Sequence, residues 1–245
     1  MTTLIAIPAR YASTRYPGKP LVSLKGPDGE KTLIRRSWEA AMAVKGVDRV
    51  VVATDDDRIR THAEAFGAEV VMTSSDAQNG TERCAEVAAK LPGYDVVVNL
   101  QGDFPTIRPE TLRAVLDPLE DPSVDIGTLV CPIADEKEAR TDSFVKCACG
   151  FMGDAVVAPA LYFSRLPIPW GEGPRWHHIG VYAYRRAALD RFVTLPASPL
   201  ELREKLEQLR ALEAGMKISA ARVEHGPFGV DTPEDLERAR ALLAP

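Results

Sequence analysis

Residues 4–21 read LIAIPARYASTRYPGKPL, a short apolar run that leads directly into a basic loop. The run Leu4–Pro8 predicts a buried strand, because a continuous apolar segment of this length is typical of a strand covered on both faces. The loop combines cations with small residues: Arg10, Arg15 and Lys19, with Ser13, Thr14 and Gly18 between them. The carboxyl end of a parallel strand is where α/β sheets bind ligands, and such residues suit phosphate oxygens. The stretch therefore predicts an anion-binding loop on an α/β sheet.

The basic loop lacks the two common glycine motifs of nucleotide-binding proteins. Neither G-x-G-x-x-G nor G-x-x-x-x-G-K-[ST] occurs in it. A nicotinamide oxidoreductase and a P-loop NTPase are therefore disfavoured. A merely solvated basic loop is the alternative interpretation, but the cations of an acidic protein gather at the place where a nucleotide would dock.

Apolar runs and helical patterns alternate through the first half of the chain. Expected strands are Arg49–Ala53, Glu69–Met72 and Asp95–Leu100. Expected helices are Thr32–Ala43, Arg58–Phe66, Thr81–Lys90 and Pro109–Leu116. Strands that are solid runs of Val and Ile, separated by helices, indicate a parallel sheet with helices on both faces.

The second half of the chain is less regular. Strands are expected at Asp125–Val130, Phe144–Cys149, Ala155–Arg165, His178–Tyr184 and Lys217–Arg222, and a loop at Pro167–Pro174. Helices are expected at Arg186–Val193, at Pro199–Glu213, and after an N-cap at Thr232. In the second of these helices Leu202, Leu206 and Leu209 form one apolar stripe. No clean linker separates the halves, so we expect two lobes of one body.

Composition sets broad limits on function. The chain has 245 residues, of which 45% are hydrophobic and 27% charged, and its net charge is −5. This composition is that of a globular protein and excludes a disordered or collagen-like chain. We expect no nucleic-acid partner, because neutralising many phosphates needs a basic surface.

No targeting or membrane segment is expected. The N-terminal apolar run lacks a basic start, and no run of about 18 apolar residues occurs anywhere. We therefore expect a cytoplasmic protein without membrane contact, with reduced thiols at its four cysteines: Cys84, Cys131, Cys147 and Cys149.

Two aspartates follow apolar segments where a metal ion would sit. Asp103 lies in Gln101-Gly-Asp-Phe-Pro105, just after an expected strand, and Asp231 stands just before the last helix. Mg²⁺ takes one or two carboxylates together with phosphate oxygens and water. A simple turn and a helix cap are the alternatives for the two segments. Together with the basic loop, the aspartates fit a nucleotidyl-transfer site.

Several other polar residues are weaker signals on their own. Adjacent strand residues point to opposite faces, so His177 and His178 are disfavoured as a metal pair, whereas His178 and Tyr182 share a face. Glu207 and Gln208 lie in a helical pattern whose simplest interpretation is a solvated face. The segment Gly80-Thr-Glu-Arg83 begins a helix and offers N–H groups and a cation to an anion.

These segments together resemble the 3-deoxy-D-manno-octulosonate (KDO) cytidylyltransferases, the CMP-KDO synthetases. The similarity covers almost the whole chain: IPARYASTRYPGKPL (7–21), VATD (52–55), MT (72–73), GTER (80–83), VNLQGD (98–103), LYFSRLPIPW (161–170), HIGVYAYR (178–185), SPLELREKLEQLRAL (198–212) and GVDTPEDLERAR (229–240). The first motif is shared with related cytidylyltransferases. The segments around 161–170, 178–185 and 206–210 are more specific to the KDO enzymes.

The resemblance implies a fold and a reaction. The fold is an α/β, Rossmann-like nucleotide-diphospho-sugar transferase with a mixed, mostly parallel sheet and a smaller dimerisation lobe. One cytidylyltransferase domain would span 1–245, with a nucleotide-binding lobe at roughly 1–130 and 186–245 and the smaller lobe at roughly 131–185. The implied reaction is CTP + KDO → CMP-KDO + pyrophosphate with Mg²⁺, for lipopolysaccharide biosynthesis, in a homodimer.

The resemblance also implies roles for individual residues. Those expected to bind the nucleotide are Ala9, Arg10, Ser13, Arg15, Lys19, Thr73 and Thr81. Those expected to contact the sugar acid are Gln101, Arg165, His178, Tyr182, Glu207 and Gln208. Asp103 and Asp231 would hold Mg²⁺ and, with Lys19, act in catalysis. The anomeric 2-hydroxyl of KDO would attack the α-phosphorus of CTP in line.

The chain departs from the family pattern at three places. Phe104 stands where many relatives have Glu, Asn79 replaces a Ser, and the loop 170–177 is shorter than in many relatives. The short loop keeps 8-amino-KDO and a sialic acid open as alternative acceptors. A non-catalytic nucleotide-binding homologue is disfavoured, because Lys19, Asp103 and Asp231 are all present.

Overall fold

Two units make up the chain in the computed structural model, which describes residues 1–12, 16–230 and 232–243. Unit 1 comprises Met1–Leu112 and Pro227–Pro245, and unit 2 comprises Arg113–Gly226. The smaller lobe expected at 131–185 lies within the range of unit 2, and its role in dimerisation stays a prediction.

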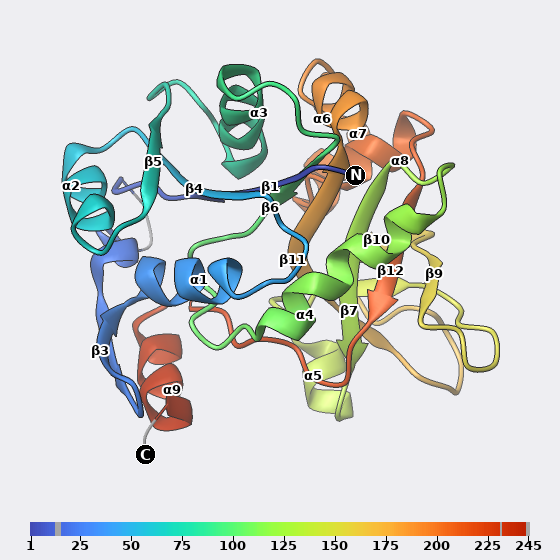
Figure 1. The fold of residues 1–245 in the computed structure, drawn as a ribbon. Helices are drawn as coiled ribbons and strands as arrows, with labels where there is room; N and C mark the ends of the chain where they lie inside the picture. The colour runs from blue at the N-terminus through green and yellow to red at the C-terminus, as the bar shows by residue number, and fades with distance from the viewer. Residues whose placement is uncertain (13–15, 231, 244–245) are drawn as a thin grey trace. The chain divides into compact units, whose positions relative to one another are not determined.

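A parallel four-stranded sheet forms the centre of unit 1. Its strands run in the order β5–β4–β1–β6: β5 (Glu69–Met72), β4 (Arg49–Thr54), β1 (Thr3–Pro8) and β6 (Val96–Asn99). The Val/Ile runs are buried because helices cover both faces. Figure 1 shows α3 on one side of β1 and β4, and α1 on the other. The predicted parallel sheet and its two covered faces are confirmed.

Helices of unit 1 follow the sequence pattern closely. They are α1 (Leu33–Met42), α2 (Asp57–Ala65), α3 (Gly80–Lys90), α4 (Pro109–Arg113), which runs one residue past the unit, and α9 (Pro233–Leu243). Thr232 caps α9 as expected: its hydroxyl accepts a hydrogen bond from the Asp235 N–H, and the Asp235 carboxylate accepts one from the Thr232 N–H. The expected helix Pro109–Leu116 is shorter, because the 3₁₀ helix η2 (Ala114–Glu120) contains Pro118, which cannot donate a helical hydrogen bond.

A hairpin that we did not predict connects the basic loop to α1. It consists of β2 (Ser23–Gly26) and β3 (Gly29–Thr32). Helix α9 packs against it, and a small core forms from residues of four segments (β2, α1, 227–230 and α9): Leu24, Leu33, Val230, Leu236 and Ala239. This core fixes Val230, and with it the end of the segment 227–230, inside unit 1.

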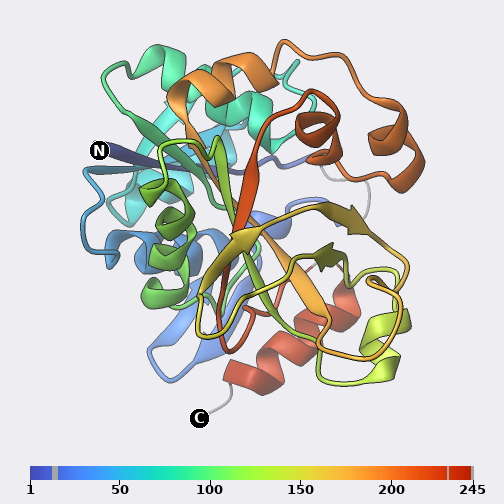
Figure 2. The same ribbon diagram turned by 90° about the vertical axis from the view of Figure 1, so that its right-hand side faces the viewer.

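Unit 2 contains a mixed sheet, whose strands face the viewer in Figure 2. Its order is β10–β8–β11–β7–β12–β9: β10 (Tyr162–Ser164), β8 (Lys146–Ala148), β11 (Trp176–Arg185), β7 (Ile126–Pro132), β12 (Ile218–Arg222) and β9 (Val157–Pro159). The β7–β12 pair is parallel and the other pairs are antiparallel.

The helices of unit 2 are α5 (Glu136–Arg140), α6 (Arg186–Phe192), α7 (Pro199–Glu204) and α8 (Leu209–Glu213). The predicted α/β class is confirmed.

Two elements predicted for unit 2 are wrong in their extent. The expected strand Ala155–Arg165 is two strands, because β9 pairs with β12 whereas β10 pairs with β8. The expected helix Pro199–Glu213 breaks at Lys205, which adopts the left-handed conformation with φ 57° and ψ 45°. The break buries Leu206 and leaves Leu202 66% exposed, so the predicted three-leucine stripe does not form.

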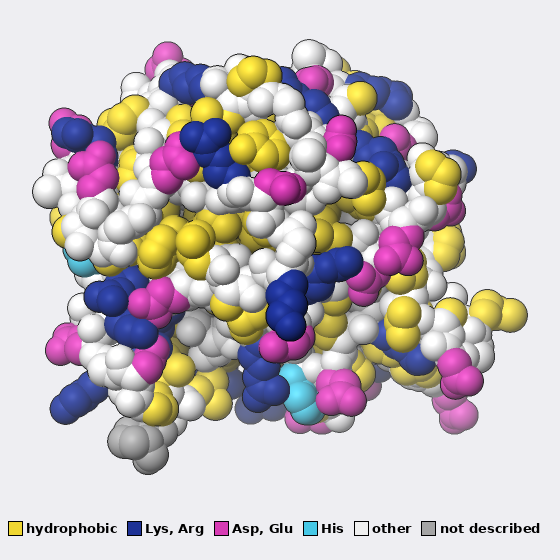
Figure 3. Space-filling view, viewed as in Figure 1, with side chains coloured by type: hydrophobic (Ala, Val, Ile, Leu, Met, Phe, Trp, Pro, Cys, Tyr) yellow, Lys and Arg dark blue, Asp and Glu magenta, His cyan; other side chains and the backbone are white. Residues whose placement is uncertain are grey.

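Lys and Arg side chains are interspersed with Asp and Glu on the face shown in Figure 3. Within the described ranges, no helix combines the length and the apolar character that crossing a bilayer requires. All four cysteines belong to the described residues and none forms a disulfide.

Candidate active site

Lys19 joins three segments of unit 1. Its ammonium donates to Asp103 Oδ2 at 2.7 Å and to the Val230 carbonyl at 2.8 Å. The Val230 N–H donates in turn to the Asp103 carbonyl at 3.0 Å. The structure therefore brings Lys19 and Asp103 together and holds Val230, the neighbour of Asp231, against the same loop. Asp231 itself, like Ser13 and Arg15, lies outside the described residues.

Gly18 turns the chain at the end of the basic loop, directly before the 3₁₀ helix Lys19–Leu21. It has a φ of 72°, a left-handed conformation that favours glycine, and its N–H donates to the Tyr11 carbonyl at 2.9 Å. A Cβ at this position would lie 3.2 Å from the Tyr11 ring. Lys19 follows immediately after this turn, and its side chain reaches Asp103 in the loop after β6.

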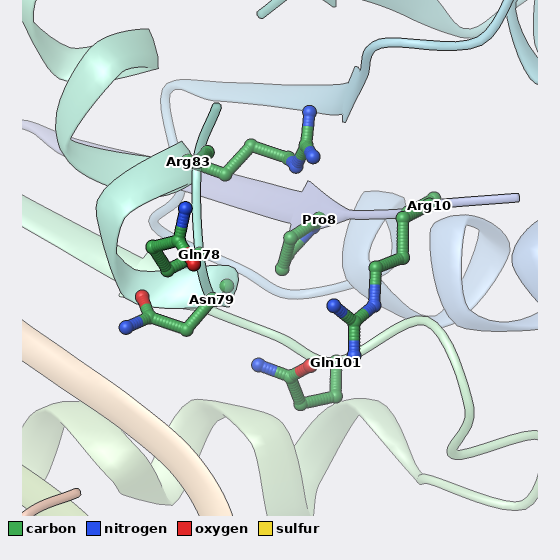
Figure 4. Close-up of a pocket in the computed structure, with 9 residues that line it drawn as sticks. Pro8, Arg10, Gln78, Asn79, Arg83 and Gln101 are labelled. Atoms are coloured by element: carbon green, nitrogen blue, oxygen red, sulfur yellow. The ribbon is translucent and has the colours of Figure 1, made fainter. Parts of the chain in front are cut away.

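A pocket lies beside the end of β1 (Figure 4). Its lining comes from three segments of unit 1: Pro8, Ala9, Arg10, Ala77, Gln78, Asn79, Gly80, Arg83 and Gln101. In Figure 4 the Arg10 side chain extends toward Gln101, and Arg83 lies on another side of the pocket. The pocket thus unites three regions that the sequence analysis singled out separately: the basic loop, the start of α3 and the loop after β6.

A chain of side-chain hydrogen bonds orients Gln101 in this pocket. Gln101 Nε2 donates to Asn99 Oδ1 at 2.8 Å, and Asn99 Nδ2 donates to the Thr81 hydroxyl at 3.3 Å. Gly80 makes room for Gln101, because a Cβ there would lie 2.8 Å from Nε2. Sequence reasoning missed Asn99, although its place on β6, directly before Leu100 and Gln101, was a usable signal.

Arg83 is buried beneath the pocket and has partners within the protein. It donates to the Thr73 hydroxyl, and its Nη2 lies 3.5 Å from Asp55 Oδ1. The arginine is 3% exposed and Asp55 is partly exposed. Arg83 therefore holds the Thr73 side chain. Its guanidinium lies near Asp55 and also lines the pocket.

Two departures from the family pattern have a structural account. Asn79 caps α3, because its side-chain oxygen accepts from the Glu82 N–H at 2.8 Å, and a serine would do the same. Phe104 packs on the segment before Asp231, where a Cβ at Gly229 would lie 3.3 Å from its ring. Phe104 thus supplies an apolar contact at this position.

His178 and Tyr182 lie together on β11 in unit 2. Their ring centroids are 5.4 Å apart, so the predicted shared face is confirmed. Burial, with a smaller effect of the His177 charge, lowers the pKa of His178 to about 3, so its ring is neutral at physiological pH. Burial, followed by the charges of Tyr184 and Glu207, raises the pKa of Tyr182 well above its usual value. The pair presents neutral hydrogen-bonding groups.

Glu207 and Gln208 lie in the turn between α7 and α8, not in a helix as predicted. The charge of Glu207 acts on the Tyr182 hydroxyl, so the turn lies close to β11. Gln208 is 6% exposed, and its Nε2 has no hydrogen-bond partner within the described parts of the chain. An unpaired buried amide is costly unless a ligand or water satisfies it, so Gln208 is a good candidate ligand contact.

Arg165 has a structural role in unit 2. Its guanidinium donates to the backbone carbonyls of Glu204, Asp142 and Lys205 at 2.9, 3.0 and 3.3 Å. These bonds hold the end of α7 against β10. Its expected contact with the sugar acid stays a prediction.

The sequence of the chain is similar to those of known cytidylyltransferases. The family model described as cytidylyltransferase matches residues 4–218. A protein of Rhodopseudomonas palustris (strain HaA2), named 3-deoxy-manno-octulosonate cytidylyltransferase, is 53% identical over 99% of this chain and 98% of its own length. A protein of the same name from Chelativorans sp. (strain BNC1) is 52% identical over 100% and 98%.

Solved structures show the same similarity. A structure of CMP:2-keto-3-deoxy-manno-octonic acid synthetase complexed with CTP has a TM-score of 0.89 at 41% identity, covering 99% of this chain and 98% of its own. A cytidylyltransferase from Leptospira borgpetersenii, at 18% identity and a TM-score of 0.63 over 98% and 86% of the two chains, shares the fold alone.

Proposed function

The chain belongs to the 3-deoxy-manno-octulosonate cytidylyltransferase family, and we propose from this that it transfers CMP from CTP to KDO and releases pyrophosphate. The observation that carries the proposal is the junction at Lys19, which joins the basic loop, the Asp103 loop and the segment ending at Val230. It places a cation and a carboxylate at the carboxyl end of a parallel sheet, where α/β proteins bind nucleotides. The product serves lipopolysaccharide biosynthesis.

The nucleotide contacts are assigned to the basic loop and its neighbours. Arg10 and Lys19 bind the phosphates of CTP, together with Ser13 and Arg15 of the same loop. The Ala9 N–H already donates to the Ala53 carbonyl at 2.8 Å, so the Ala9 carbonyl is the group we assign to the cytosine amino group. Thr73 and Thr81, which line the same edge through their hydrogen bonds to Arg83 and Asn99, complete the set.

Mg²⁺ is the metal that fits this chemistry. This ion takes one or two carboxylates and obtains its remaining ligands from phosphates and water. Asp103, which is partly exposed, and Asp231 would hold it. The ion, when bound, offsets negative charge on the α-phosphate and on the departing pyrophosphate.

Lys19 has a distinct role beside the metal ligands. Its ammonium offsets the Asp103 charge before substrates bind, and the triphosphate then offers it stronger anionic partners. Phosphate binding therefore draws Lys19 from Asp103 and frees the carboxylate for the cation.

The acceptor contacts are assigned, as the resemblance implies, to five residues: Gln101, His178, Tyr182, Glu207 and Gln208. All of them offer the hydrogen-bonding groups that a polyhydroxylated acid needs.

The chemical step is a displacement at phosphorus. The anomeric 2-hydroxyl of KDO attacks the α-phosphorus, the new P–O bond forms as the bond to pyrophosphate breaks, and the hydroxyl proton is lost to solvent. The positive side chains of the basic loop offset the charge that develops on the leaving group.

We also assign a homodimer, formed through unit 2. Large apolar side chains are exposed there within the expected dimerisation lobe: Met152, Val156, Leu161, Leu166 and Trp170. Trp170 is fully exposed, which is unusual for a side chain of its size. A second copy of the chain would cover these residues, and light scattering on a Trp170→Ala variant tests whether the dimer forms through them.

A cytoplasmic location fits CTP as substrate and cysteines that form no disulfide.

Mass spectrometry of the products tests the proposed reaction. Wild-type protein with CTP, KDO and Mg²⁺ should form CMP-KDO and pyrophosphate in equal amounts. Asp103→Asn, which preserves side-chain size, should form neither while keeping the circular dichroism spectrum of the wild type. Formation of free CMP without a sugar adduct would instead indicate a nucleotide hydrolase.

A further inference from the structure

Strand β11 carries a bulge opposite Thr128. Ile179 pairs with Leu129 of β7 and Tyr182 pairs with Thr128, so two extra residues, Gly180 and Val181, stand between adjacent positions of the partner strand. In a regular strand the Cα atoms of His178 and Tyr182 would be about 13 Å apart. The bulge places them two positions apart along β7 instead, which is why their rings are in contact.

The Thr128 hydroxyl occupies the centre of this bulge. It is fully buried and lies 2.9 Å from the Val181 carbonyl, 3.3 Å from the Ile179 carbonyl and 3.0 Å from His178 Nε2. The two carbonyls belong to the residues where the ladder is interrupted. The hydroxyl therefore stabilises the bulge as well as the histidine.

These three distances favour one assignment of the proton on the His178 ring. A hydroxyl has one hydrogen, and a carbonyl can only accept. We assign the Thr128 hydrogen to the nearest acceptor, the Val181 carbonyl at 2.9 Å, and in this assignment the hydroxyl oxygen accepts from the imidazole. His178 is consequently protonated at Nε2, and its Nδ1 carries a lone pair. The ring is held from the sides by the edge-on contact with Phe163 at 4.9 Å and by Tyr182.

We propose that Thr128 is a positioning residue that holds His178 in the Nε2–H tautomer, so that Nδ1 accepts a hydrogen bond from a hydroxyl group of the sugar acid. This rests on the proposed function only for the identity of the ligand. An acceptor nitrogen selects a hydroxyl or amino donor and disfavours a carboxylate. The bulge and Thr128 together thus determine which end of the acceptor faces β11.

Nitrogen-15 NMR of the histidine rings tests the tautomer without any substrate. His178→Asn identifies the His178 signals by their loss. The wild type and the matched control Thr128→Ser should both show a protonated Nε2 and an unprotonated Nδ1. Thr128→Val keeps the size of the side chain but removes the hydroxyl, and should shift the ring toward the other tautomer. A wild-type ring protonated at Nδ1 would overturn the proposal, even if the valine variant failed to fold.

Kinetics distinguish positioning from a merely structural role. Thr128→Val should raise the KM for KDO about tenfold and change the KM for CTP less than twofold, and Thr128→Ser should restore the KM for KDO. Equal changes in both constants would refute the positioning role. If the wild type did not use KDO at all, the proposed function would fail, whereas the NMR result would still decide the role of Thr128.

Discussion

Gly80→Ala should impair catalysis while leaving the stability of the fold nearly unchanged. The added methyl would lie 2.8 Å from Gln101 Nε2 and 3.1 Å from Pro8 Cγ. Ordinary contact begins at about 3.4 Å, so the amide must move by about 0.6 Å. Directed away from Asn99, that shift stretches the 2.8 Å hydrogen bond to Asn99 Oδ1 to about 3.4 Å, where it is weak, and moves the Gln101 amide from its place in the pocket.

The expected magnitudes follow from these contacts. Loss of the Gln101–Asn99 hydrogen bond costs about 1 kcal/mol, whereas alanine at the start of α3 recovers roughly 0.5–1 kcal/mol of backbone entropy. The melting temperature should therefore change by less than about 4 °C. A misplacement of about 1 Å can reduce turnover about a hundredfold, so a smaller shift predicts a loss of about tenfold in kcat/KM for KDO.

The assay is pyrophosphate release at saturating CTP, with calorimetry on the same samples. Gly150→Ala is the matched control, because a Cβ there meets no described atom within 4 Å, and it should behave as the wild type. A Gly80→Ala enzyme with wild-type kcat/KM would refute the reasoning that the position of Gln101 matters. A large drop in melting temperature would show that the loss is one of folding.

Three further predictions address the acceptor pocket, the metal and the buried histidines. Glu207→Ala should raise the KM for KDO more than the KM for CTP, and equal increases would place Glu207 outside the acceptor pocket. Removing divalent metal with EDTA should abolish pyrophosphate release, and added Mg²⁺ should restore it; release that continues in EDTA would remove the metal from the reaction. Burial lowers the pKa of His177 to about 4 and that of His178 to about 3, against about 6.5 in the unfolded chain. The unfolded chain therefore binds more protons as the pH falls from about 6.5 toward 4, and the free energy of unfolding should decrease by up to roughly 1.4 kcal/mol per pH unit for each histidine. Urea unfolding at about pH 7 and about pH 5 measures this decrease, and identical midpoints would contradict it.

The sequence predicts unit 1 better than unit 2, for a physical reason. Solid Val and Ile runs such as Arg49–Ala53 specify buried parallel strands, and parallel strands bring their following loops to one edge. The proximity of Lys19 and Asp103 could therefore be predicted from the sequence, because the loops that carry them follow β1 and β6, which are neighbours in the sheet. The hairpin β2–β3 was missed because its strands are short and polar, although the turn at Gly26-Pro-Asp-Gly29 was a usable signal.

The role of Thr128 and the turn at Lys205 could not be predicted from local pattern. Lys205 ends α7 in a left-handed conformation although no glycine or proline marks the position. Thr128 matters because of a change of register in β11, and register depends on pairing between distant segments. Such features are decided by tertiary packing, so they are visible only in the folded chain.

The central claim is that the chain activates KDO with CTP. The most direct measurement is the rate of pyrophosphate release from CTP and Mg²⁺, with KDO, 8-amino-KDO and N-acetylneuraminate offered separately. The account predicts fast release with KDO and much slower release with the other two acids. Release with another acid alone, or with none of the three, would contradict it.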